Sequence, residues 1–231
     1  MEAFIEHFKE KLIEGLGCHT VFTIPGTNIG ISESVVVTWI VMAVIIILTL
    51  IFTRNLKLIP TGKQNYIETV VGFLNNFVVD ILGEKGKAFV PYLGTVAVFL
   101  AISNTAGVFG FKPPTKDFNV TAALALMSII LIEYSGVYEN GIKGWFKSFG
   151  HPMIIMAPMN IMEILIRPLS LCMRLFGNIL GAFIVMEMVK MVLPVVAPVV
   201  FGFYFDIFDG LIQTYIFVFL TTLFMQEKME A

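Results

Sequence analysis

The sequence contains little charge and few residues of the kinds that bind metals or form cross-links. Charged residues make up 14% of the 231 residues, and there are only 3 His and 2 Cys. Cys18 lies in a polar amino-terminal segment and Cys172 in a hydrophobic one, so the sequence predicts neither a disulfide framework nor a metal site. The formal net charge is −2, and we expect no nucleic-acid partner, no metal and no cofactor.

Apolar residues dominate the sequence instead. Hydrophobic residues make up 57% of it, with 22 Phe among them, and the mean hydropathy is +0.87. The first residues, from Met1 to Leu16, mix Glu, Lys and His with apolar residues and lack the uninterrupted apolar run of a signal peptide. We find no internal repeat and no low-complexity tract. The composition therefore predicts an all-α integral membrane protein.

Hydrophobic periodicity predicts about five transmembrane helices and one interfacial helix. Residues 1–34 are expected to form an extracytoplasmic arm, and residues 35–53 form an uncharged run long enough to cross about 30 Å of hydrocarbon. The basic loop that begins at Arg54 is expected in the cytoplasm, which puts the amino terminus outside. Residues 64–87 read as an amphipathic helix at the interface, and residues 90–136 as a transmembrane hairpin.

Residues 152–226 are expected to form a long, tilted helical hairpin. At about 1.5 Å per residue, residues 153–190 would be nearly twice as long as the hydrocarbon is thick. One tilted helix, kinked at Pro168, is the simpler solution, and two short upright spans are the alternative. Pro194 and Pro198 predict the break before the last span, which leaves residues 227–231 as a cytoplasmic tail.

Polar side chains form a stripe on each of the last two helices. The members on the longer helix follow one another at spacings of 4, 3, 4, 4 and 3, which places them on one face: Glu163, Arg167, Ser170, Arg174, Asn178 and Gly181. On the last helix Asp206, Asp209 and Gln213 are spaced by 3 and 4 and also share a face. Two facing stripes can line a water-accessible path, because hydrocarbon would penalise these groups. Alternatively, the two aspartates are simply near-interface residues.

Arg174 is the most informative residue of the stripe. An arginine at the bilayer centre costs roughly 2.5 to 3.5 kcal/mol on insertion scales, and its guanidinium does not lose its proton. No carboxylate lies within four residues of Arg174, so its partner must come from another helix, another chain or water. For other stripe members structural roles stay open: Glu163 and Arg167 could be an ion pair, and Gly177 and Gly181 a close-packing pair.

The segments around Arg174 and Gln213 resemble subunit a of the membrane sector of bacterial F-type ATP synthase. The matching strings are Arg167-Pro-Leu-Ser-Leu-Cys-Met-Arg174-Leu-Phe-Gly-Asn178 and Leu211-Ile-Gln213-Thr-Tyr-Ile-Phe217, with weaker similarity in residues 60–68, 104–107 and 121–126. The resemblance implies a bacterial plasma-membrane protein that carries ions and is not itself catalytic. Its implied partners are the ring of c subunits, the subunit b stalk, other ATP synthase subunits and membrane lipid.

The resemblance also implies roles for the polar residues. Arg174 would face the ring carboxylates, flanked by Asn178 and Gln213. Because a fixed positive charge favours the ionised form of a nearby carboxylate, Arg174 would make each arriving carboxylate release its proton or sodium ion. Asp206 would occupy the position on the last helix where relatives carry an ionisable residue that lines the outer half-channel. The predicted topology, and not the resemblance, places Glu163 and Ser170 on the cytoplasmic side for an inner half-channel, and adds Asp209 and Glu187 to the outer one.

One position departs from the pattern of the relatives. They often carry an ionisable residue nine positions after the arginine, where this sequence has Phe183. The nearest acid is Glu187, about one turn farther along the helix. Whether the outer path uses Glu187 or the two aspartates alone stays open.

Two other classes of function are weighed. Asp206-x-x-Asp209-Gly210 resembles part of the metal-binding motif of CDP-alcohol phosphotransferases, but Leu211 and Ile212 follow and no aspartate lies downstream. A solute transporter could use Arg174 to bind an anion, but the sequence lacks the internal repeat typical of transporters.

Overall fold

A computed structural model describes Glu6 and residues 20–23, 30–54, 62–148, 157–192 and 196–230. Most of the expected amino-terminal arm, the loop after Arg54 and Pro194 of the expected break lie outside these residues. Pro198, the other proline of that break, is described and does not interrupt the chain, because it lies in the first turn of the helix Val196–Phe203.

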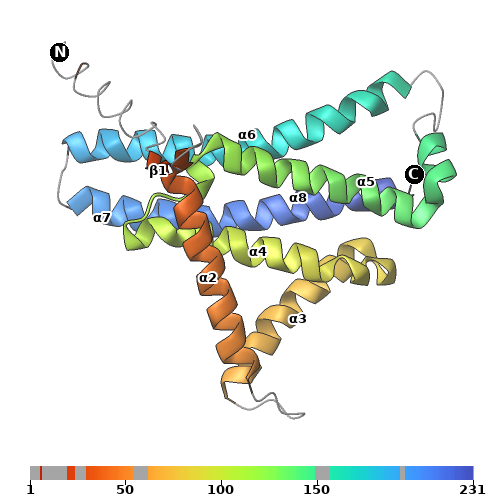
Figure 1. Cartoon of the computed structure of the whole chain (residues 1–231), viewed down its shortest axis with the longest axis horizontal. Coiled ribbons are helices and arrows are strands. Elements are labelled where there is room, and N and C mark those ends of the chain that lie inside the picture. Colours follow the sequence, from red (N-terminus) through yellow and green to blue (C-terminus); the bar gives the residue numbers. More distant parts are fainter. Residues whose placement is uncertain are drawn as a thin grey trace.

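Helices make up nearly all of the described chain (Figure 1). They are α2 (Glu33–Thr53), α3 (Lys63–Leu82), α4 (Val90–Thr105), α5 (Phe118–Ser148), α6 (Ala157–Val192), α7 (Val196–Phe203) and α8 (Gly210–Glu230). Short 3-10 turns follow α3 and α4, namely η1 (Glu84–Ala88), η2 (Ala106–Phe109) and η3 (Pro114–Lys116), and the π-helical segment η5 (Tyr204–Asp209) joins α7 to α8. Five helical stretches are long and apolar enough to cross a membrane, which confirms the predicted all-α membrane fold.

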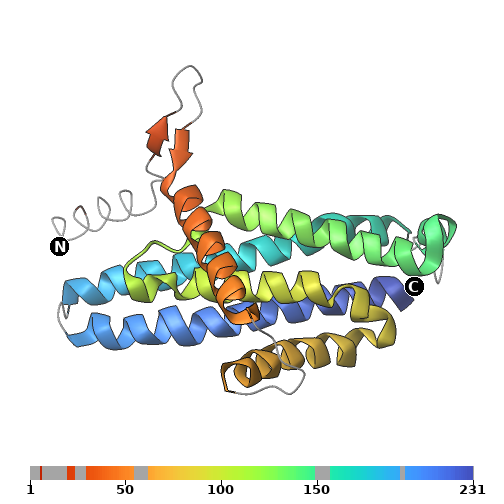
Figure 2. The same cartoon turned by 60° about the horizontal axis from the view of Figure 1, so that its bottom comes forward.

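A small strand pair precedes the first span and was not predicted. β1 (Thr20–Thr23) pairs antiparallel with β2 (Gly30–Ser32), with Thr23 opposite Gly30. β1 is rich in β-branched and aromatic residues, which favour strands, but four residues are too few to give a periodic signal. Figure 2 shows the pair projecting from the amino-terminal end of α2.

Four helices lie side by side and α2 crosses them. α5 packs on α6 and α8, and α4 packs on α8, while α2 runs across this group toward α3 (Figures 1 and 2). α6 continues through Pro168 for 36 residues, about 54 Å at 1.5 Å per residue, so the single long helix is confirmed. Such a helix must tilt to stay within a bilayer.

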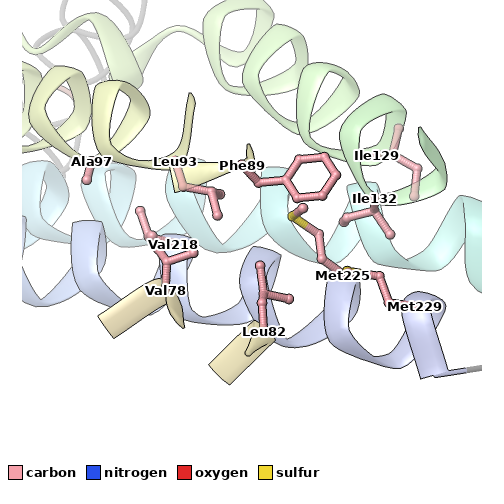
Figure 3. Packing of buried hydrophobic residues seen from close by; sticks show 10 residues of the cluster. All are labelled: Val78, Leu82, Phe89, Leu93, Ala97, Ile129, Ile132, Val218, Met225 and Met229. Carbon is pink, nitrogen blue, oxygen red and sulfur yellow. The ribbon is translucent and has the colours of Figure 1, made fainter. Parts of the chain in front are cut away.

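Two apolar clusters hold the helices together. The larger one, drawn in Figure 3, joins α3, α4, α5 and α8 through Val78, Leu82, Phe89, Leu93, Ala97, Ile129, Ile132, Val218, Met225 and Met229. The other consists of Leu100, Ala125, Leu171, Cys172, Leu175 and Phe217. Lipid tails are as apolar as these side chains, so helix association here depends on close packing and on polar contacts between helices.

α5 extends beyond residue 136, where the transmembrane hairpin was expected to end. It bends at Gly141, whose φ of 68° suits glycine, and continues to Ser148. The bend lets Trp145 turn back, so that its Nε1 donates a hydrogen bond to Glu133 Oε2 at 2.7 Å. The Asn140 amide donates to the carbonyl of Lys228 at 3.3 Å, which ties this end of α5 to the carboxyl end of α8.

Asn104 on α4 is a buried polar residue that connects three parts of the bundle, and it is 4% exposed. Its Nδ2 donates to the Gly210 carbonyl at 3.2 Å and to Thr214 Oγ1 at 3.3 Å, and its Oδ1 accepts from Thr115 Oγ1 at 2.9 Å. One side chain thus joins α4, the turn η3 and the start of α8.

We expect Asn104→Leu to destabilise the fold, because it leaves the buried hydroxyl of Thr115 without its acceptor, at a cost of roughly 1 to 3 kcal/mol. Thermal unfolding of the purified protein in detergent measures this cost. Asn119→Leu, at an exposed position on α5, is the matched control and should change stability by less than about 0.5 kcal/mol. Equal melting temperatures for the two variants would contradict the assignment.

Candidate functional site

The middle of α6 carries a polar face that no described residue covers. Ser170, Arg174, Asn178 and Gly181 are all exposed. Arg174 forms no ion pair or hydrogen bond with the residues that the structure describes. Since an arginine in hydrocarbon costs roughly 2.5 to 3.5 kcal/mol, this face requires a partner beyond the described chain.

The two glycines beside Arg174 do not pack against another helix of the described chain. A Cβ added at Gly177 or at Gly181 would meet no heavy atom within 4 Å. The close-packing role considered for this pair therefore has no partner among the described residues. Small residues on an exposed helix face do allow a second molecule to approach the backbone.

Arg167 belongs to the same stripe but, unlike Arg174, is buried and paired with carboxylates. It is 6% exposed, and its Nη2 lies 2.5 Å from Glu163 Oε2 and 2.6 Å from Glu227 Oε1. Its Cζ lies 5.0 Å from the centre of the Phe224 ring, close enough for a cation–π contact. This arginine binds α6 to the end of α8, so the stripe divides into a paired part at Glu163 and Arg167 and an open part around Arg174.

Asn178 and Gln213 connect α6 to α8 near Arg174. Asn178 Nδ2 donates to Gln213 Oε1 at 2.5 Å. Gln213 is 1% exposed, and its Nε2 has no hydrogen-bond partner among the described residues. A buried donor without a partner costs roughly 1 to 3 kcal/mol, so a water molecule that accepts a hydrogen bond from this amide would be stabilised here.

A cavity of about 410 Å³ is lined by this pair of amides. Residues of the turn η3 and of the carboxyl-terminal part of α6 also line it. The charged residues of its wall are Lys112, Lys116, Glu187, Lys190, Asp206 and Asp209. Arg174 and Ser170 are not among the described residues that line it.

The carboxylates reach the cavity because of local backbone geometry. Asp206 and Asp209 lie in the π-helical segment η5, a form of helix that often occurs at functional sites. Asp206 lies against Gly107, where an added Cβ would stand 2.5 Å from Asp206 Oδ1, so only glycine leaves room for the carboxylate. Glu187 is 9% exposed and accepts a hydrogen bond from Lys190 Nζ at 2.7 Å.

The structure thus gathers some candidate residues and separates others. One cavity wall holds Asn178, Glu187, Asp206, Asp209 and Gln213. The inner candidates remain apart, because Glu163 is bound to Arg167 and Ser170 lies on the exposed face beside Arg174.

Lys116 is a site residue that the sequence analysis missed. Its Nζ lies 3.2 Å from the centre of the Phe183 ring. Burial, together with the nearby charge of Lys112, lowers the pKa of Lys116 to about 8. Lys116 lies in the turn η3 and not on a periodic helix face, so helical spacing carried no signal for it. Gly107 was also missed, because only the close approach of Asp206 reveals its role.

Comparison with known proteins gives one consistent family. Residues 35–226 match the family model described as ATP synthase A chain. A protein named ATP synthase subunit a 2 from Bradyrhizobium sp. (strain BTAi1) is 35% identical over 198 residues, which cover 85% of this chain and 88% of the relative. ATP synthase subunit a 1 from Pelobacter propionicus is 36% identical over 204 residues, which cover 86% of this chain and 88% of the relative. A third relative, from Propionigenium modestum, is named ATP synthase subunit a, sodium ion specific. It is 32% identical over 212 residues, which cover 85% of this chain and 73% of the relative.

Water access to the cavity can be tested with cysteine substitutions of two isoleucines, one on α6 and one on α5. In a chain without its native cysteines, Ile179→Cys in the cavity wall should react with a charged, water-soluble thiol reagent. Ile130→Cys, on an exposed apolar face of α5, should react slowly because lipid surrounds it and excludes water. Equal rates for both cysteines, measured in native membranes, would contradict a water-filled cavity.

Proposed function

The chain belongs to the ATP synthase A chain family, and we propose that it is the ion-translocating stator subunit, subunit a, of an F-type ATP synthase. It is a multi-pass membrane protein and a component of the ATP synthase complex. Ion flow through it would drive rotation of a ring of c subunits, and the catalytic step would take place in other subunits.

The observation that carries the proposal is the open position of Arg174. This charge lies on a face of α6 with exposed Ser170, Asn178 and two glycines, and it has no partner in the described chain. A ring of helices that carry carboxylates would supply both the missing counter-charge and the missing cover. The glycines would let the ring helices approach closely.

The outer path would be the cavity that is lined by Asn178 and Gln213. Its carboxylates, Asp206, Asp209 and Glu187, would bind and release the ion as it enters. Glu187 is already paired with Lys190, so we assign the main exchange to the two aspartates. The unpartnered amide of Gln213 would hold water where the cavity meets the ring.

The inner path would begin at Ser170, one turn from Arg174 on the exposed face. Glu163 would lie farther toward the cytoplasm. Its pairing with Arg167 would restrict it to shaping the mouth of this path rather than carrying the ion. Arg174 would stand between the two paths and repel cations, which blocks a direct leak.

Rotation follows from the cost of charge in lipid. A ring carboxylate that faces Arg174 is stabilised in its ionised form. It can leave for the lipid only after it binds an ion from one path, because a bare charge in hydrocarbon costs several kcal/mol. Binding from the outer path and release to the inner path then give one direction of rotation.

Orientation and further partners follow from the same proposal. Arg54, Lys143 and Lys147 would lie in the cytoplasm by the positive-inside rule, with the carboxyl terminus beside them and the amino terminus outside. The host membrane would be a bacterial plasma membrane, since the named relatives come from bacteria. The exposed apolar sides of α2 would contact lipid and the subunit b stalk.

Arg174→Gln should abolish coupled ATP synthesis in an assembled complex, because the fixed charge that ionises the ring carboxylates is removed. Arg174→Lys should fail or nearly fail, because lysine lacks the planar fork and loses its proton more readily when desolvated. ATP synthesis in inverted vesicles, with assembly checked on the same sample, is the measurement. Lys147→Gln, at an exposed end of α5, is the control and should keep normal synthesis. Near-normal synthesis by assembled Arg174→Gln would refute the stator role.

A further inference from the structure

Lys116 is held rigidly in the wall of the cavity. It ends the turn η3, in which Pro114 and Thr115 are buried and Thr115 donates its hydrogen bond to Asn104. The Lys116 side chain is half-buried in the cavity wall, with Nζ 3.2 Å from the centre of the Phe183 ring. An ammonium over an aromatic face is attracted to it, so this position is stabilised without an acidic partner.

The neighbouring carboxylates are already paired with other lysines. Glu33 on α2 accepts from Lys112 Nζ at 2.8 Å, and Glu187 on α6 accepts from Lys190 Nζ at 2.7 Å. No described residue forms an ion pair with Lys116. Four charged groups act on Lys116, namely two lysines and the two glutamates paired with them, and their opposite charges largely offset one another. Asp206 and Asp209 lie in the same cavity wall.

This position lets Lys116 lose its proton more easily than an exposed lysine does. An ordinary lysine keeps its proton up to a pKa of about 10.4. Burial first, and then the charge of Lys112, lower the pKa of Lys116 to about 8. The ammonium and the neutral amine therefore both exist at mildly alkaline pH, which is the condition under which a side chain can transfer protons rapidly.

We propose that Lys116 is a proton-exchanging residue at the entrance of the outer path, and that the ion taken by this path is the proton. The inference rests on the proposed function. The Lys116 ammonium gives one proton to a cavity water, which becomes hydronium and passes it toward the aspartates. The neutral amine then takes a proton from a water molecule on the outer side, which leaves hydroxide there. A sodium ion cannot use this step, because it carries no proton.

The test is ATP synthesis by the intact complex in proteoliposomes, with the pH on the outer face varied around 8 at constant total driving force. For the unmodified complex we expect the rate to fall as the outer pH rises through about 8, because the proton-donating form of Lys116 is lost. Synthesis should not require sodium.

Two substitutions separate proton exchange from a structural role. Lys116→Arg keeps a cation above Phe183 but does not lose its proton, so the rate should fall by roughly tenfold and the inflection near pH 8 should vanish. Lys116→His still titrates, so the inflection should persist and move down by about 1.5 pH units, given an ordinary histidine pKa of about 6.5. Lys143→Arg, at an exposed position on α5, is the control and should match the unmodified complex.

Three outcomes would overturn the proposal: Lys116→Arg with an unchanged pH profile, Lys116→His with an unmoved inflection, or synthesis driven by sodium. Arg174→Gln in the same vesicles keeps the two proposals apart. If Arg174→Gln makes no ATP while Lys116→Arg behaves like the unmodified complex, only the role of Lys116 fails. If Arg174→Gln still makes ATP, the stator function itself fails.

Discussion

A permanent positive charge within the bilayer must be neutralised or solvated, and Arg174 imposes this requirement on the whole chain. Its guanidinium keeps its proton at any physiological pH. The described chain gives it no ion pair and leaves its face of α6 open. Arg167, seven residues earlier, has two carboxylates and an aromatic ring around it. Arg167 thus joins two helices through ion pairs, whereas Arg174 has no counter-charge within the described chain.

The rest of the fold leaves that face open and places a cavity beside it. α5 and α8 cover the other side of α6 with the apolar clusters, and Asn104 fixes the start of α8 against α4. The π-helical segment turns two carboxylates toward a cavity that Gln213 also lines. In our account the cavity delivers the ion close to Arg174 but not past it, which is the separation that a rotary mechanism needs.

Much of this arrangement could be predicted from local sequence. Long apolar runs predict membrane helices, and polar residues at spacings of 3 and 4 predict the stripes on α6 and α8. Proline at position 168 gave no break, because lipid leaves a long helix no better way to satisfy its backbone. The length of α6 could therefore be predicted from its long apolar run and from the tolerance of membrane helices for proline.

The missed features depend on contacts between distant segments. Helical spacing places Arg167 and Arg174 on one face, yet only the position of Glu227 at the end of α8 explains why one is buried. Lys116 reaches Phe183 from a turn that lies far away in the sequence. Gly107 matters only because Asp206 approaches it. Such pairings are set by tertiary packing, and no periodic pattern in a single segment encodes them.

The most direct test of the account is an experimental structure of the assembled complex in lipid. It should show the Ser170, Arg174 and Gly181 face of α6 covered by ring helices. The Arg174 guanidinium should lie within hydrogen-bond reach of a ring carboxylate, directly or through one water. A structure in which lipid covers this face, with the ring against another helix, would contradict the account.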